Sequence, residues 1–198
     1  MTHGSGGASI LPAWVDVLWI VALAAVLVFH CICLARMGVE HRWLHLAHAA
    51  MIVGMIYMYA ASASAPTLVS ARVWMWFYVV TTSAIVVWML VCSGWERPFS
   101  YLWWPALVQQ AAMIYMWAST SDWVAWLTYT FAFYFLIEAL AWLLGLRVEG
   151  MPGNARAFGP GARSMVVPLG DGSPIGKISM ATMAASMGYM FVGMQLRM

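Results

Sequence analysis

The fold is predicted most directly from the stretch His41-Arg42-Trp43-Leu44-His45-Leu46-Ala47-His48-Ala49-Ala50-Met51-Ile52-Val53-Gly54-Met55-Ile56-Tyr57-Met58. Imidazoles and thioethers recur in it every three or four residues, at positions 41, 45, 48, 51, 55 and 58. This spacing places them along one face of an α-helix. At ~1.5 Å per residue the face is about 25 Å long, which approaches the thickness of a bilayer core. We therefore predict a membrane-spanning helix with histidines at one end and methionines at the other.

The composition of the whole chain agrees with a membrane location. Of the 198 residues, 64% are hydrophobic and 8% are charged, whereas soluble domains have about 25% charged residues. The nine Lys and Arg residues are scattered between hydrophobic runs, and this argues against a nucleic-acid-binding surface. Three cysteines, an odd number, predict no disulfide framework.

The hydrophobic segments predict an all-α fold, a polytopic membrane bundle of six transmembrane helices that forms one domain over residues 1–198. The expected helices cover about residues 14–36, 42–62, 71–93, 100–118, 122–146 and 177–196. Residues 1–12 are expected to be a mobile tail. Residues 147–176 are rich in Gly and Pro, and they predict a loop on the cytoplasmic side.

The distribution of Lys and Arg predicts the orientation of this bundle. Six spans place both termini on the same side of a membrane. Seven of the nine basic residues follow odd-numbered helices, and only Arg72 and Arg197 lie on the other side. The positive-inside rule then predicts that both termini lie outside the cytoplasm, in a multi-pass protein of a bacterial inner membrane.

Two further helices carry methionines at helical spacing. The last predicted helix has Met180, Met183, Met187, Met190 and Met194, with intervals of three and four, and the helix 100–118 has Gln109, Met113 and Met116. The helices 42–62, 100–118 and 177–196 are expected to run in the same direction. Their methionines should therefore lie at comparable depth, and we expect them to meet.

These stripes predict a site for Cu(I), because thioether and neutral imidazole both bind this soft ion. Cu(I) would be held by the methionines and passed to or from a cytoplasmic-side cluster of His and Cys, which includes Cys31, Cys33 and Cys92. The function would be transport, or delivery to a membrane cuproenzyme or copper chaperone, without catalysis. The candidate ligands are His30, His41, His45, His48, Met51, Met55, Met58, Met113, Met116, Met183, Met187, Met190 and Met194.

Other readings of the same residues stay open. Methionine fills gaps in any helix core, so the chain could be a structural or assembly subunit without metal, alone or as a homo-oligomer. Two of His30, His45 and His48 could instead ligate a b-type haem. Glu138 lies within a predicted span and could pair with a histidine, or be a protonated structural residue.

The run His45-Leu-Ala-His48-Ala-Ala-Met51-Ile-Val-Gly-Met55-Ile-Tyr-Met58, with six spans and a Met-striped last helix, resembles a family of actinobacterial multi-pass membrane proteins. That resemblance implies a bacterial inner-membrane location and no particular activity. In residue chemistry alone, the interval Met51, Met55 and Met58 is similar to that of Met-lined copper permeases and copper-resistance membrane proteins.

Overall fold

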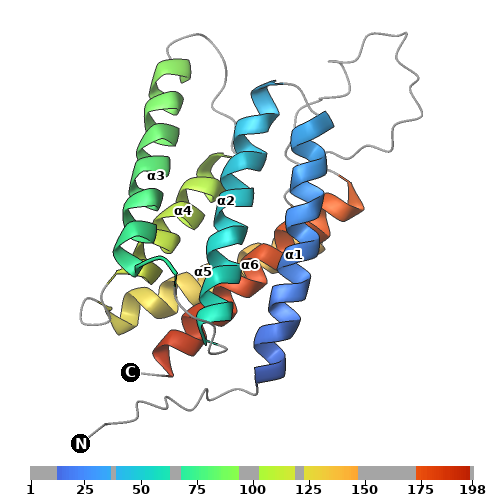
Figure 1. Ribbon diagram of the computed structural model, residues 1–198. Helices are drawn as coiled ribbons and strands as arrows, with labels where there is room; N and C mark the ends of the chain where they lie inside the picture. Colours follow the sequence, from blue (N-terminus) through green and yellow to red (C-terminus); the bar gives the residue numbers. More distant parts are fainter. Residues whose placement is uncertain are drawn as a thin grey trace, which may run out of the picture.

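The computed structural model (Figure 1) describes residues 13–36, 39–62, 68–93, 103–118, 123–146 and 173–196. Within these ranges the side chains of residues 13, 39–43, 88, 89, 92, 93, 103 and 104 are outside the description. The described part consists of six α-helices and contains no strand, which confirms the predicted all-α fold. The helices are α1 (Ala13–Arg36), α2 (Val39–Ser62), α3 (Ala71–Ser93), α4 (Trp103–Trp117), α5 (Ala125–Leu143) and α6 (Pro174–Gln195).

The helices form three hairpins. The most extensive packing joins neighbours in sequence, α1 with α2, α3 with α4 and α5 with α6. Additional contacts of α1 with α6 and of α2 with α4 join the hairpins into one bundle. Figure 1 shows that α2, α4 and α6 run in one general direction and the other helices run in the opposite one. This agrees with the predicted common direction of the three Met-bearing helices.

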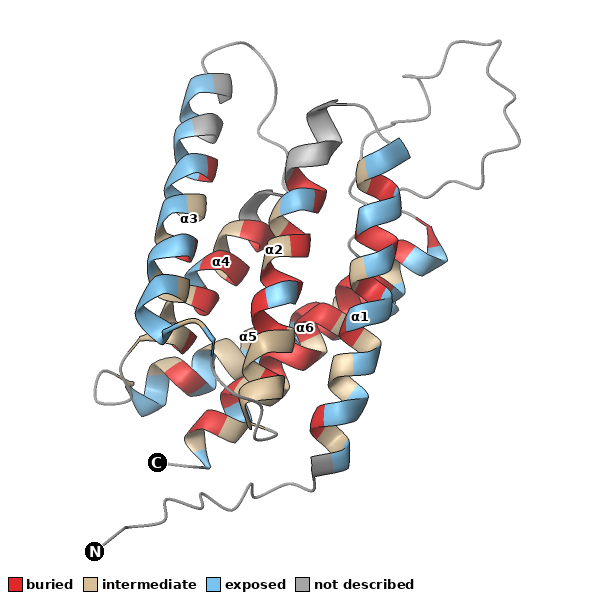
Figure 2. Cartoon of the chain, in the orientation of Figure 1, coloured by how far each residue is buried: buried red, intermediate tan, exposed pale blue. Residues whose placement is uncertain are grey.

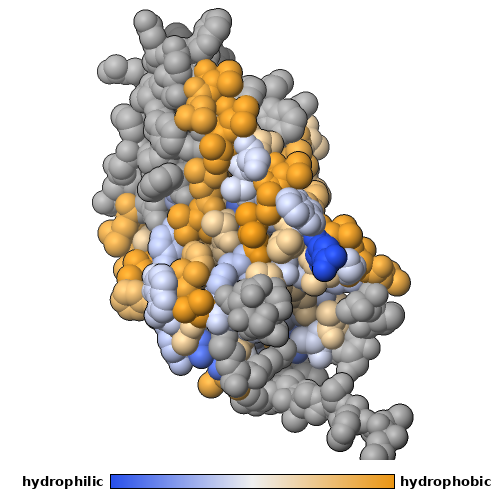
Figure 3. Space-filling view, turned by 90° about the vertical axis from the view of Figure 1, so that its left-hand side faces the viewer, coloured by the Kyte–Doolittle hydropathy of each residue, from blue (hydrophilic) through white to orange (hydrophobic). Residues whose placement is uncertain are grey.

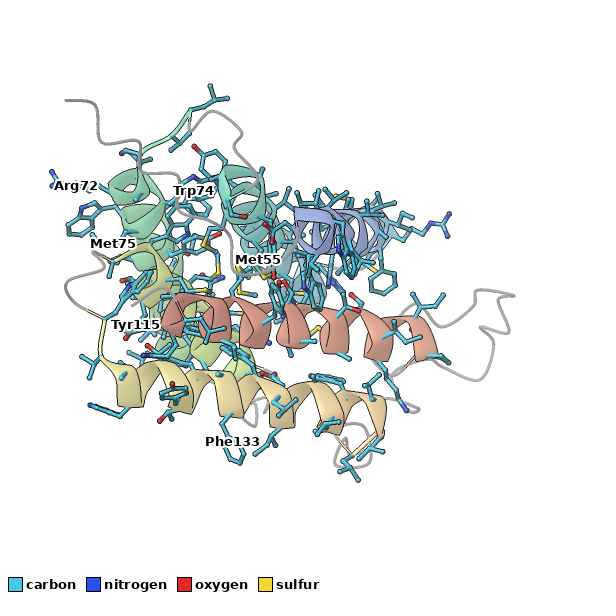
Figure 4. All side chains as sticks on the ribbon, turned by 90° about the horizontal axis from the view of Figure 1, so that it is seen from below. Met55, Arg72, Trp74, Met75, Tyr115 and Phe133 are labelled. Carbon is cyan, nitrogen blue, oxygen red and sulfur yellow. The ribbon has the colours of Figure 1, made fainter. Side chains whose placement is uncertain are left out.

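The centre of the bundle is α6. Ser, Gly, Ala and Met residues of this helix are buried over its whole length, and in Figure 2 the buried colour covers much of α6 and the inner faces of α2 and α4. Figure 4 shows α6 between α5 on one side and α1 with α2 on the other. Because α6 contacts protein on several sides, its small side chains serve close packing between helices.

Three helical segments of the described part are long and apolar enough to cross a membrane: Trp14–Arg36, Leu44–Ser62 and Ala125–Leu143. A shorter apolar stretch, Ala71–Val87, lies in α3. Large apolar side chains are exposed along α1, α3 and α5, among them Val21, Trp76 and Phe133. Figure 3 shows apolar atoms along the described surface on the α3 side. Such faces suit contact with lipid, because a soluble protein rarely exposes so much continuous apolar surface.

Several predicted boundaries were wrong by a few residues. Helix α6 begins at Pro174 rather than 177, because Ser173 caps it and accepts a hydrogen bond from the Gly176 amide at 2.9 Å. The predicted loop 147–176 is therefore too long at its end. Helix α5 ends at Leu143 rather than at 146, where Gly145 adopts a positive φ of 75°. Helix α4 ends at Trp117 rather than at 118, and its predicted start at 100 lies outside the described residues.

Part of the sequence prediction concerns residues that the structure does not describe. The tail 1–12, most of the segment 147–172 and the side chains of His41 and Cys92 are outside the described residues. The number of membrane crossings and the side on which the termini lie stay predictions.

Candidate metal centre

Methionines from α2, α4 and α6 meet in one hydrophobic core. Eight of the described methionines belong to the same cluster of buried residues, and Met58 and Met190 pack against it partly buried. We call these ten residues the sulfur core. In Figure 4 several sulfur atoms gather near the labelled Met55, between α2 and α6. Its buried members are Met51, Met55, Met113, Met116, Met180, Met183, Met187 and Met194.

Polar contacts fix α2 against α6 beside the sulfur core. The hydroxyl of Ser186 on α6 lies 3.9 Å from the Met55 sulfur and 3.2 Å from the Tyr59 hydroxyl of α2. Tyr59 in turn donates a hydrogen bond to the Ser186 carbonyl at 3.1 Å. The predicted contact between the helices of the first and second Met stripes is therefore present in the structure.

Helix α4 approaches α2 at Gly54. A Cβ atom built on Gly54 would lie 3.0 Å from the Met113 methyl group and would also collide with the Tyr78 hydroxyl of α3. Tyr78 donates to the Ala50 carbonyl at 3.0 Å, so α3 is fixed to the same part of α2. The absence of a side chain at position 54 thus lets Met113 reach the surface of α2.

Three buried histidines form a second group, which we call the imidazole cluster: His30 of α1 and His45 and His48 of α2. The Nδ1 atoms of His30 and His45 are 2.9 Å apart, and the Ser179 hydroxyl of α6 lies 3.2 Å from His30 Nε2. The ring of His30 also stacks on His48, with centroids 5.3 Å apart. Three helices thus meet at His30.

The two hydrogen bonds of His30 are coupled by its tautomer. A neutral imidazole has one N–H donor and one acceptor nitrogen. If His30 donates from Nδ1 to His45, its Nε2 accepts from Ser179; if His45 donates, Nε2 of His30 donates to the Ser179 oxygen. Either arrangement satisfies both rings without a net charge, which suits a site inside an apolar bundle.

The imidazole cluster borders the sulfur core along α2. His48 is one turn before Met51, and both side chains are buried. At the other end of this face, Trp19 of α1 stacks on Tyr59, and Ser62 donates to Asp16 at 2.8 Å. Asp16 is therefore buried and has Ser62 as a hydrogen-bond partner. Along α2 the buried functional groups are therefore first imidazoles, then thioethers, and finally a phenol beside a carboxylate.

Glu138 has a partner from another helix. The Gln109 amide of α4 donates to its Oε1 at 3.2 Å, and both side chains are almost completely buried. The neighbouring Gln110 accepts a hydrogen bond from Thr81 at 3.2 Å and donates to the Ala47 carbonyl at 3.5 Å. The two glutamines thus connect α4 with α5, α3 and α2.

The two described cysteines of the predicted His and Cys cluster differ in exposure. Cys31 is exposed, whereas Cys33 on the same helix is buried. Among the described residues, no three His, Cys, Asp or Glu side chains form a group that could hold a metal ion together.

Sequence reasoning missed Ser179 and Ser186, which touch the imidazole cluster and the sulfur core respectively. A signal was present, because the two serines are seven residues apart and therefore lie on one helix face, next to the methionine stripe. Tyr59 was missed as well, although it directly follows Met58.

Comparison of this chain with protein-family models, with curated proteins and with solved structures finds no match.

Proposed function

We propose that this protein binds Cu(I) inside the helical bundle and moves it between the sulfur core and the imidazole cluster. The observation that supports the proposal is the convergence of eight buried thioethers from three helices next to three buried imidazoles. A stripe of methionines on one helix is a common packing pattern. Three such stripes that meet bring many soft ligands to one place.

The chemistry of the two groups suits a passing ion. Thioethers are neutral and select soft metals, so Cu(I) keeps its charge among them. Imidazole is a stronger donor, and three such rings at the end of the sulfur core would attract the ion there. A protein with this arrangement would conduct Cu(I) across a bacterial inner membrane or deliver it to a membrane cuproenzyme or copper chaperone.

The principal alternative is a structural or assembly subunit without metal. The methionines pack in the same continuous core as Leu23, Phe135 and Trp142, and close packing alone is a sufficient reason for flexible side chains. Binding of b-type haem is less favourable. A haem would use two of the three histidines of the imidazole cluster and would leave the convergence of buried thioethers without a function.

Metal analysis of purified protein tests the proposal. The protein is loaded with Cu(I) under reducing conditions in detergent, washed, and analysed for copper and by absorption spectroscopy. We expect the wild type to retain copper and the variant Met51→Leu/Met55→Leu/Met58→Leu to lose most of it. Folding should persist, because Leu conserves the volume and hydrophobicity of Met.

A matched control separates copper binding from a general loss of methionine. Met75 is partly buried on α3 and does not belong to the sulfur core, and Figure 4 shows it well away from Met55. Met75→Leu should retain as much copper as the wild type. Absence of copper from all three proteins, together with a featureless spectrum, would favour the structural subunit.

A further inference from the structure

Among the three described histidines, His48 differs in its hydrogen bonding. Both of its ring nitrogens are buried without a partner, whereas His30 and His45 bond to each other. The Leu44 carbonyl, one turn earlier, lies near the His48 ring but does not form a hydrogen bond with it. A buried polar group without a partner lowers stability, so packing alone gives no reason for an imidazole at this position.

Thioethers of α2 and α6 belong to the surroundings of His48. On α6, Ser179 contacts His30, which stacks on His48, and Ser186 contacts Met55 and Tyr59. Residues 179, 183 and 186 share one helix face by their spacing. Met183 therefore lies between the two contacts, on the face that α6 turns toward α1 and α2. On α2, Met51 lies between His48 and Met55, and Met51 and Met183 belong to the same buried cluster.

We propose that His48, Met51 and Met183 form a mixed imidazole–thioether site for Cu(I), at the junction of the sulfur core and the imidazole cluster. One nitrogen and two sulfur donors make a three-coordinate set of the soft kind that Cu(I) accepts. The proposed site rests on the proposed function, and it names the residues at which the ion would pass from sulfur ligands to nitrogen ligands.

His30 and His45 are positioning residues in this proposal. Their mutual hydrogen bond occupies one nitrogen of each ring, and Ser179 occupies the second nitrogen of His30. The His30 ring is thereby held against the face of His48. Both nitrogens of His30 are therefore engaged, so an ion that leaves His48 for His30 must first displace His45 or Ser179.

The first test needs no copper. Replacing His48 with Leu removes an unpartnered polar group, and we expect the melting temperature of the metal-free protein to rise by about 2–4 °C. His30→Leu should lower it, because His45 and Ser179 lose their partner. If His48→Leu lowers the melting temperature as much as His30→Leu does, His48 is a structural residue and the proposal is overturned.

The second test identifies the donor atoms by X-ray absorption at the copper edge on protein loaded with Cu(I). We expect nitrogen and sulfur neighbours in the wild type, and sulfur alone in His48→Leu. His30→Leu should keep the mixed signal. A mixed signal in His48→Leu, or sulfur alone in the wild type, would refute the His48 site and leave copper binding intact. A wild type that holds no copper would refute both this site and the proposed function.

Discussion

At the scale of single residues, the interior leaves little free volume, and Gly54 shows this most clearly. A methyl group at this position would meet the Tyr78 hydroxyl and the Met113 methyl group. Tyr78 is completely buried and bonded to Ala50, so it cannot withdraw without losing that bond.

Gly54→Ala should therefore destabilise the protein by about 1–3 kcal/mol, the usual result of overpacking a dense core. Thermal unfolding in detergent measures the change. Gly193→Ala on α6 is the matched control, since no atom lies within 4 Å of the added carbon. The control should be neutral or slightly stabilising, because Ala favours helix over Gly. Equal destabilisation by both variants would contradict the close approach at Gly54.

The sequence predicted which side chains belong to the candidate site more fully than it predicted which of them contact one another. Helical spacing alone predicts that His45, His48 and Met51 share a face, because the pitch of a helix is fixed. The bond of His30 to His45, and the lack of one at His48, depend on the separation and rotation of α1 and α2. Those quantities follow from the packing of whole helix surfaces, which spacing within one helix does not determine.

At the scale of helices, buried polar pairs connect elements that are distant in the sequence. Gln109 of α4 donates to Glu138 of α5 across the interior. The sequence marked Glu138 as an unusual residue within a span and left its partner open between a histidine and a structural hydrogen bond. The contact with Gln109 could not be predicted, because it requires α4 and α5 to be neighbours.

A double-mutant cycle tests the coupling of these two helices. Glu138→Leu should cost about 1–3 kcal/mol, because the buried Gln109 amide loses its acceptor. Gln109→Leu should cost a similar amount. The double variant should be less destabilised than the sum of the single variants, with an interaction free energy of about 0.5–3 kcal/mol from unfolding measurements. Strict additivity would show that the hydrogen bond contributes nothing to the packing of α4 on α5.

The position of α6 explains a further difference between sequence and structure. Its Met periodicity predicted a helix at nearly the observed place, but α6 is not among the segments that are apolar enough by themselves to span a membrane. Its serines Ser179 and Ser186 and its glycines Gly176 and Gly188 are buried against protein. Polar side chains are acceptable there because neighbouring helices supply partners, such as Tyr59 for Ser186.

At the scale of the whole molecule, the three hairpins place the start of α1 and the end of α6 at the same end of the bundle in Figure 1. We predict that this end lies outside the cytoplasm, since the predicted spans place seven of the nine basic residues on the other side. An alkaline phosphatase fused after residue 198 should be active in bacteria, and a fluorescent protein fused there should stay dark. The same reporters inserted between residues 147 and 172 should give the reverse pattern. A bright fusion after residue 198 would contradict six crossings in this orientation.

The central place of α6 also has a consequence for biosynthesis. A ribosome makes α6 after the other five helices, so the nascent bundle exists for a time without its centre. The faces that later contact α6 carry thioethers of α2, such as Met55, and aromatic rings of α5, such as Phe135, and these side chains can rest against lipid tails at little cost. His30 and His45 lie on the first hairpin and can bond to each other before Ser179 has been synthesised. The most polar part of the interior is thus protected early, and the arrival of α6 completes it.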